Sequence, residues 1–140
     1  MASVEIEALT AGLKAWGERT HRATKEGVQE AGTELKGVIR DALGRLEYPP
    51  ASPRGEPPAR RSGDLQDSVQ QRTLDVDGGY QQRVYPSIVY ARIHELSGWA
   101  GKGHKSFLPK RPYVQPSLDE FRTDFRPIMI DAWREALPGG

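Results

Sequence analysis

The sequence predicts an α+β fold with a long N-terminal helix, short central helices, a small antiparallel sheet with a hairpin, and a C-terminal helix kinked near Pro127. Two observations predict this fold: both ends of the chain carry apolar residues at helical spacing, and a tight-turn sequence separates two extended segments between them. The 140 residues suit one domain. We divide this domain into an N-terminal helix (1–46), a proline-rich arm (47–61), an α+β core (62–115) and a C-terminal helix (116–137).

An apolar seam runs along the predicted N-terminal helix. Its residues recur at steps of three and four, as one helix face requires, and they include Ile6, Leu9, Leu13, Trp16, Ala23, Val28, Ala31, Leu35, Val38, Ala42 and Leu46. An unbroken helix would be roughly 60 Å long at 1.5 Å per residue, which is more than a domain of this size can cover. We therefore expect Leu9, Leu13 and Trp16 to stay exposed in one subunit and to be buried in an assembly.

Two glycines interrupt this helical pattern. Gly27 and Gly32 each cost about 1 kcal/mol relative to alanine inside a helix. We expect the helix to bend or break near them.

The arm is rich in proline, with five of the chain's eleven prolines between residues 49 and 58. Proline fixes φ and has no N–H group, so the arm should be extended and outside any regular ladder. At its end, Ser62-Gly63-Asp64-Leu65 predicts a helix start with Ser62 as the N-cap. Leu65 and Val69 would share one face of that helix.

The segment RTLDVDGGYQQRVY, residues 72–85, predicts a hairpin. Leu74 and Val76 alternate on one face, and Asp77-Gly78-Gly79 supplies the positive φ of a tight turn. The next segment, 87–98, fits either a strand or a helix: its β-branched start favours extension, whereas 91–96 before Gly98 favours a short helix with a glycine stop. We expect Tyr90 and Ile93 in the core.

The C-terminal segment, 116–137, has apolar residues at helical spacing. Pro127 lies inside this segment. Because proline removes a helical hydrogen bond, we expect a kink or a restart of the helix there.

Residues 98–110 form a predicted glycine-rich and basic loop. Lys102, Lys105 and Lys110 repel one another, and three glycines make ordering costly, so the loop should be mobile in a free subunit. Trp99 and Phe107 distinguish it from an ordinary solvated loop, because large rings are typical interface anchors. The alternative is that both rings fold back onto the domain and the lysines face water.

The residues that carry chemistry are sparse. The chain has no cysteine, and its net charge of +1 is too small for a dedicated nucleic-acid binder. His94-Glu95 resembles the start of a zinc protease motif, but Gly98 occupies the place of the second histidine. We predict no catalytic, cofactor-binding or metal-binding residues, and the start of the chain carries no apolar run long enough for a membrane span.

Three motifs in a fixed order resemble the tail-completion or head-tail joining proteins of long-tailed bacteriophages, which are minor tail or neck components. The first is the proline-rich arm leading into Ser62-Gly63-Asp64-Leu65, and the second is YARIHELSG with Tyr90, Ala91 and Glu95. The third is KRPYVQPSLDE, with Arg111, Pro112 and Tyr113. Here Tyr113 stands where phenylalanine is commoner, and Ser97 is inserted before Gly98.

The resemblance implies a structural virion protein rather than an enzyme. It implies a ring of identical subunits, sixfold to match a tail tube, assembled in the host cytoplasm between tail-terminator or tail-tube proteins and head connector proteins, with non-specific DNA contact in the channel. It also implies that the arm, through Pro53, Pro57 and Pro58, is a strap along its own or a neighbouring subunit. The alternative is a small nucleic-acid-associated adaptor that uses the basic loop 98–111.

Glu95 and Arg111 carry opposite charges in neighbouring motifs. A planar guanidinium held before a proline and an aromatic residue suits a carboxylate. We therefore predict an ion pair between them that joins the Tyr90 element to the start of the last helix.

Overall fold

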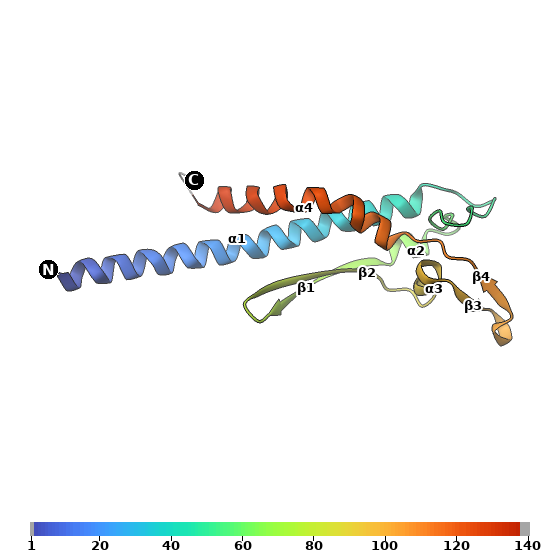
Figure 1. Ribbon diagram of the computed structural model, residues 1–140, viewed down its shortest axis with the longest axis horizontal. Helices are drawn as coiled ribbons and strands as arrows, with labels where there is room; N and C mark the ends of the chain where they lie inside the picture. Colours follow the sequence, from blue (N-terminus) through green and yellow to red (C-terminus); the bar gives the residue numbers. More distant parts are fainter. Residues whose placement is uncertain (1, 138–140) are drawn as a thin grey trace.

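The computed structural model describes residues 2–137, with side chains described from residue 5, and it confirms the α+β class. Figure 1 shows α1 lying between α4, which runs antiparallel to it, and the β1–β2 hairpin. The elements are α1 (Ala2–Gly44), α2 (Asp64–Asp67), β1 (Val69–Val76), β2 (Gly79–Pro86), α3 (Ala91–Leu96), β3 (Gly98–Ala100), the 3-10 turn η1 (Lys102–His104), β4 (Ser106–Leu108) and α4 (Val114–Ala136).

The N-terminal helix is continuous, so the predicted break near its glycines is wrong, and a bend there stays a prediction. The glycines instead allow other elements to approach closely. A Cβ atom on Gly27 would lie 2.9 Å from Met129 Sδ and 3.0 Å from Ala132 Cβ, both on α4. A Cβ atom on Gly32 would overlap the side chain of Gln82 on β2. The helix tolerates both residues because tertiary contact with α4 and β2 offsets their low helix propensity.

The core lies along the second half of α1. Ile39 and Leu43 pack with Val69 of β1 and with Tyr113 just before α4. A second cluster joins α1 to α4 through Ala31, Phe121 and Ile128, and Leu35 packs against both clusters. The C-terminal helix is thereby held on α1, where the Trp133 indole also donates to Thr24 Oγ1 at 2.9 Å.

The hairpin is confirmed, with antiparallel pairs from Val69 opposite Pro86 to Val76 opposite Gly79. Its turn is Asp77-Gly78, and Gly78 has a φ of 76°, which glycine adopts without strain. The strand begins at Val69, so the prediction that Leu65 and Val69 share a helix face is wrong. Both residues still pack in the core around Ile39.

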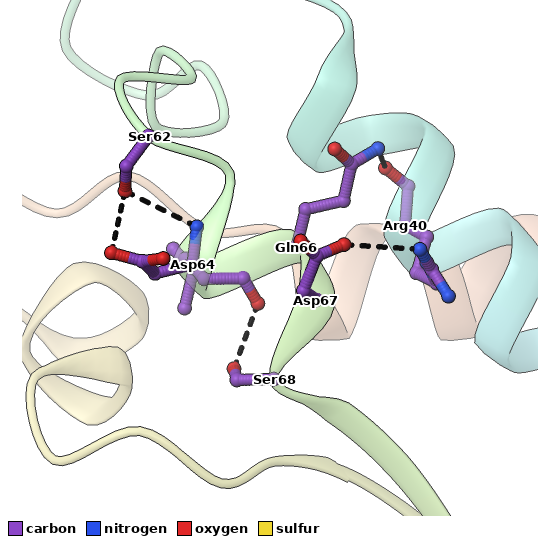
Figure 2. Close-up of polar contacts among 7 residues, drawn as sticks. Arg40, Ser62, Asp64, Gln66, Asp67 and Ser68 are labelled. Carbon is purple, nitrogen blue, oxygen red and sulfur yellow. Dashed lines mark hydrogen bonds and ion pairs between the residues drawn. The ribbon is translucent and has the colours of Figure 1, made fainter.

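The helix that follows the arm is shorter than predicted, and its N-cap is Gly63, with φ 94°, rather than Ser62. The hydroxyl of Ser62 accepts from the Asp64 N–H at 3.3 Å and donates to the Asp64 carboxylate at 2.6 Å, as Figure 2 shows. Ser62 therefore stabilises the turn one residue before the helix. The predicted cap is wrong because the positive φ of Gly63 turns the chain between Ser62 and the helix.

Two polar contacts fasten α2 to α1. The Gln66 side-chain amide donates to the Arg40 carbonyl at 2.8 Å, and the Arg40 guanidinium forms an ion pair with Asp67 at 3.2 Å (Figure 2). These contacts fix the point at which the chain leaves the arm and enters the hairpin.

Residues 91–96 are helical, which decides the alternative that the sequence left open. The helix ends at Ser97, with φ 68°, and Gly98 begins β3 instead of stopping the helix. The expectation of Tyr90 in the core is wrong, because its side chain is 44% exposed, whereas Tyr113 is fully buried.

The C-terminal helix begins at Val114, two residues before the predicted start, and it is one helix through Pro127. A restart at Pro127 is therefore wrong, and the kink stays a prediction. Pro116 lies in the first turn, where a missing N–H costs no intrahelical hydrogen bond.

Candidate assembly surfaces

The first surface is an apolar row on the part of α1 that lies beyond the packed region. Figure 1 shows the N-terminal part of α1 extending past the hairpin turn and past the end of α4. Four large side chains there, Ile6, Leu9, Leu13 and Trp16, are between 51% and 64% exposed. We call these four residues the helix row. Helical spacing places them on one side of α1, with no part of the described chain covering them.

The second surface is the tip formed by β3 and β4, where the sequence predicted a loop. The strands pair antiparallel, and Trp99 lies opposite Phe107. The two rings meet edge to face with centroids 5.4 Å apart, yet they remain 58% and 49% exposed. They pack on each other rather than folding back onto the domain. Lys102 and Lys105 are exposed at the turn, so the tip joins two large rings to positive charge.

A glutamate at the end of α3 organises the start of the last helix. One Glu95 carboxylate oxygen accepts from the backbone N–H groups of Tyr113 at 2.8 Å and Val114 at 3.0 Å. The other oxygen accepts from the N–H of Gln115 at 3.0 Å. A carboxylate at a helix N-terminus satisfies groups that have no intrahelical partner and interacts favourably with the helix dipole. Glu95 therefore acts as the cap of α4 from a distant position in the sequence.

The predicted ion pair between Glu95 and Arg111 is wrong. Among the ion pairs of the described residues, none joins them. Both Glu95 oxygens already accept backbone N–H groups, and Arg111 contacts other elements: its N–H donates to the His94 carbonyl at 2.7 Å, and its Nε donates to the Ser52 carbonyl at 3.2 Å. Arg111 thus connects α3 to the arm.

Tyr113 completes the connection between the two motifs. Its hydroxyl donates to the Ala91 carbonyl at 3.2 Å, and its own carbonyl accepts from the Ser117 hydroxyl. Burial, followed by the nearby charge of Glu95 and then Tyr90, raises the pKa of Tyr113 well above its usual value. Two motif segments therefore pack against each other, residues 90–95 and residues 111–113. Pro112, in the second segment, is half-buried.

The arm folds back on its own chain instead of lying extended. The Tyr48 N–H donates to the Arg60 carbonyl at 2.9 Å, and the Arg60 N–H donates to the Leu46 carbonyl at 2.7 Å, so both ends of the arm are tied together. Pro57 and Pro58 are buried within the chain, whereas Pro53 is exposed. Of the two places expected for the strap, Pro57 and Pro58 lie against their own subunit, and contact of the arm with a neighbouring subunit stays a prediction.

Sequence reasoning missed a contact that holds the hairpin on α1. Tyr80 at the start of β2 places its hydroxyl 2.6 Å from His21 Nε2, and Lys25 lies 5.5 Å from the centre of the Tyr80 ring. The residues are 59 positions apart, and the sequence pattern carries no signal of the pairing.

Other classes of site find no support in the described residues. Residues 2–137 contain no cluster of three or more histidine, cysteine, aspartate or glutamate side chains suited to a metal ion. None of the helices in this part of the chain is long and apolar enough to cross a membrane. Comparison with protein-family models, with curated proteins and with solved structures finds no match to the chain.

Proposed function

We propose that the protein is a structural component of a phage virion, located at the junction of head and tail. It forms a ring of identical subunits, sixfold to match a tail tube, that completes the tail and joins it to the head connector. The ring assembles in the host cytoplasm. The chain carries no catalytic step in this role, and its work is to present surfaces to copies of itself and to tail and connector proteins.

The observation that carries the proposal is the exposed helix row. Fully burying a leucine or a residue of similar size contributes about 1.5–3 kcal/mol, and soluble monomers rarely leave several large apolar residues exposed in one contiguous strip. Ile6, Leu9, Leu13 and Trp16 form such a strip on a helix with no covering element of its own. An assembly that buries this strip supplies what the single chain lacks.

The position of the tip adds support for a ring. Figure 1 places the β3–β4 tip at the opposite end of the molecule from the start of α1. Contacts between different surfaces of identical subunits are heterologous, and they close into rings when the rotation between neighbours permits. Two apolar surfaces at opposite ends suit this kind of contact.

The exposed basic tip favours the second candidate, an adaptor that binds nucleic acid. Lys102 and Lys105 flank exposed rings, and such rings stack on unpaired bases. Binding to DNA that weakens steeply with salt, together with a monomeric protein, would favour the adaptor over the ring.

The test of the ring compares two double variants on the same helix. Leu9→Ser with Leu13→Ser removes half of the helix row, whereas Ala8→Ser with Ala11→Ser makes the matched polar change away from it. Light scattering after size exclusion should show a ring for the natural protein and the alanine variant, and monomers for the leucine variant. Joining of separately prepared heads and tails, counted as infectious particles, should follow the same order.

Two outcomes would contradict the proposal. One is a natural protein that remains monomeric at high concentration and in the presence of tail tubes. The other is a leucine variant that joins heads to tails as well as the natural protein does.

A further inference from the structure

A cavity of about 520 Å³ lies where the arm, α2, α3 and β4 meet. Its apolar lining is formed by Leu43, Pro58, Leu65, Ile93 and Leu108. The volume suits a small organic group or one or two side chains. The polar residues of its lining come from separate segments of the chain.

Two arginines give the cavity a surplus of positive charge. Arg61 and Arg111 both line it, and neither is part of an ion pair among the described residues. Arg61 lies over the Tyr48 ring, with its guanidinium carbon 4.0 Å from the ring centre. Arg111 uses Nε for the Ser52 carbonyl, so its two terminal nitrogens are free to donate.

The other charged groups of the lining do not cancel this surplus. Arg60 also lines the cavity, but it forms an ion pair at 3.5 Å with Glu47, which is not part of the lining. Asp64 is the carboxylate in the lining, and the Ser62 hydroxyl donates to it. Two guanidinium groups therefore remain against one carboxylate that already accepts a hydrogen bond.

Two buried polar atoms in the same lining have no hydrogen-bond partner. They are Ser52 Oγ, on a residue that is only 6% exposed, and His94 Nδ1. Buried polar groups are normally paired, since leaving one unpaired costs about 1–3 kcal/mol. Burial, followed by the charges of Arg111 and Arg61, lowers the pKa of His94, which favours its neutral form.

We propose that this cavity binds a carboxylate carried by an apolar group, with Arg61 and Arg111 contacting the carboxylate. A guanidinium matches a carboxylate with two parallel hydrogen bonds, and the apolar lining buries the attached group. The proposal does not depend on the ring or on a role in the virion.

The test uses benzoate as the probe and benzamide as its neutral match of the same size and shape. Benzoate should shift the NMR signals of the His94 ring and of residues 52, 61 and 111 in a saturable way. Benzamide should bind at least tenfold more weakly, because it lacks the charge that the arginines contact. Inorganic phosphate tests whether an oxyanion without an apolar body suffices, and it should also bind at least tenfold more weakly than benzoate.

Variants assign the binding to this cavity. Arg61→Gln and Arg111→Gln should each weaken benzoate binding at least tenfold, whereas Arg126→Gln on the exposed side of α4 should leave it unchanged. Arg111→Gln removes a hydrogen bond to the arm and could disturb it. Arg61 is exposed, so Arg61→Gln should leave the fold intact and test the cavity separately. Equal binding of benzoate and benzamide, phosphate binding as tight as benzoate binding, or benzoate binding that survives Arg61→Gln would each overturn the proposal.

Discussion

The two halves of α1 have the same apolar pattern but opposite environments. From Ala23 to Leu43 this side of α1 is covered by α4 and the hairpin. Ala23 of the predicted seam is almost completely buried there, and so are Ile39 and Leu43, which the predicted seam did not include. From Ile6 to Trp16 the same spacing continues, yet each large side chain keeps more than half of its surface exposed. One helix therefore belongs to the domain at one end and extends outside it at the other.

This difference shows that periodicity identifies the apolar face of a helix but not what covers it. The coverage depends on the lengths of the other elements. The hairpin has eight residues in each strand and α4 has 23 residues, whereas α1 has 43 residues. The excess length of α1 has to project or meet another molecule.

The largest contrast is expected from shortening one apolar residue in each half. Ile39→Ala should lower the free energy of unfolding by about 2–5 kcal/mol, because it leaves a cavity between α1, β1 and Tyr113. Leu13→Ala should change the stability of the monomer by less than about 0.5 kcal/mol, as exposed substitutions do. Urea unfolding of both variants at a concentration that keeps the protein monomeric measures the contrast. Similar losses for the two would show that the helix row is covered in the free subunit.

A smaller effect is expected from weakening the hold on α4, which covers the buried half of α1. Glu95→Gln keeps the shape of the side chain but removes the charge and turns one acceptor into a donor facing a backbone N–H. The free energy of unfolding should fall by about 1.5–3 kcal/mol, as for hydrogen bonds to charged groups. The exposed Glu120→Gln on α4 is the control and should change stability by less than about 0.5 kcal/mol. Equal stability of the two variants would mean that the Glu95 contacts contribute little.

The smallest effects, of opposite sign, are expected from the same glycine substitution in each half. The Cβ atom that Gly12→Ala adds has no neighbour within 4 Å. The substitution should stabilise the projecting helix locally by up to about 1 kcal/mol, which slower amide hydrogen exchange there would show. Gly27→Ala would crowd Met129 and Ala132, and the cost of overpacking should exceed the gain in propensity by about 1 kcal/mol. A stabilising Gly27→Ala would show that α4 moves away at little cost.

Local patterns predicted most of the fold but not its close contacts. The hairpin followed from Asp77-Gly78-Gly79 because the turn chemistry acts within a few residues. The close approach of α4 to Gly27 was not predictable, since it involves Met129 and Ala132, more than 100 residues away. The β3–β4 tip was missed because three-residue strands are too short to show alternation, and its glycines and lysines are typical of a loop.

The motif residues were identified from the sequence, but the chemistry assigned to them was only partly right. The Tyr90 motif and the start of the last helix do lie together, as the predicted ion pair required, but through other contacts: Tyr113 N–H to Glu95, Tyr113 OH to the Ala91 carbonyl and Arg111 N–H to the His94 carbonyl. The opposite charges of Glu95 and Arg111 suggested an ion pair, whereas Glu95 accepts hydrogen bonds from backbone N–H groups at the start of α4. A carboxylate can serve as a helix cap only if the chain brings it to the helix start, and sequence spacing does not reveal that. The cavity between the arm and α3 had no sequence signal for the same reason.

The contact between Tyr80 and His21 lies where the packed part of α1 meets its projecting part. His21 is the residue of α1 that contacts Tyr80 at the start of β2, and the helix between His21 and its N-terminal end is about 28 Å long at 1.5 Å per residue. A change of about 5° in the direction of α1 at His21 would move the N-terminal end of the helix by about 2.5 Å. The position of the helix row in space therefore depends on how the hairpin and α4 hold α1 near His21 and Thr24.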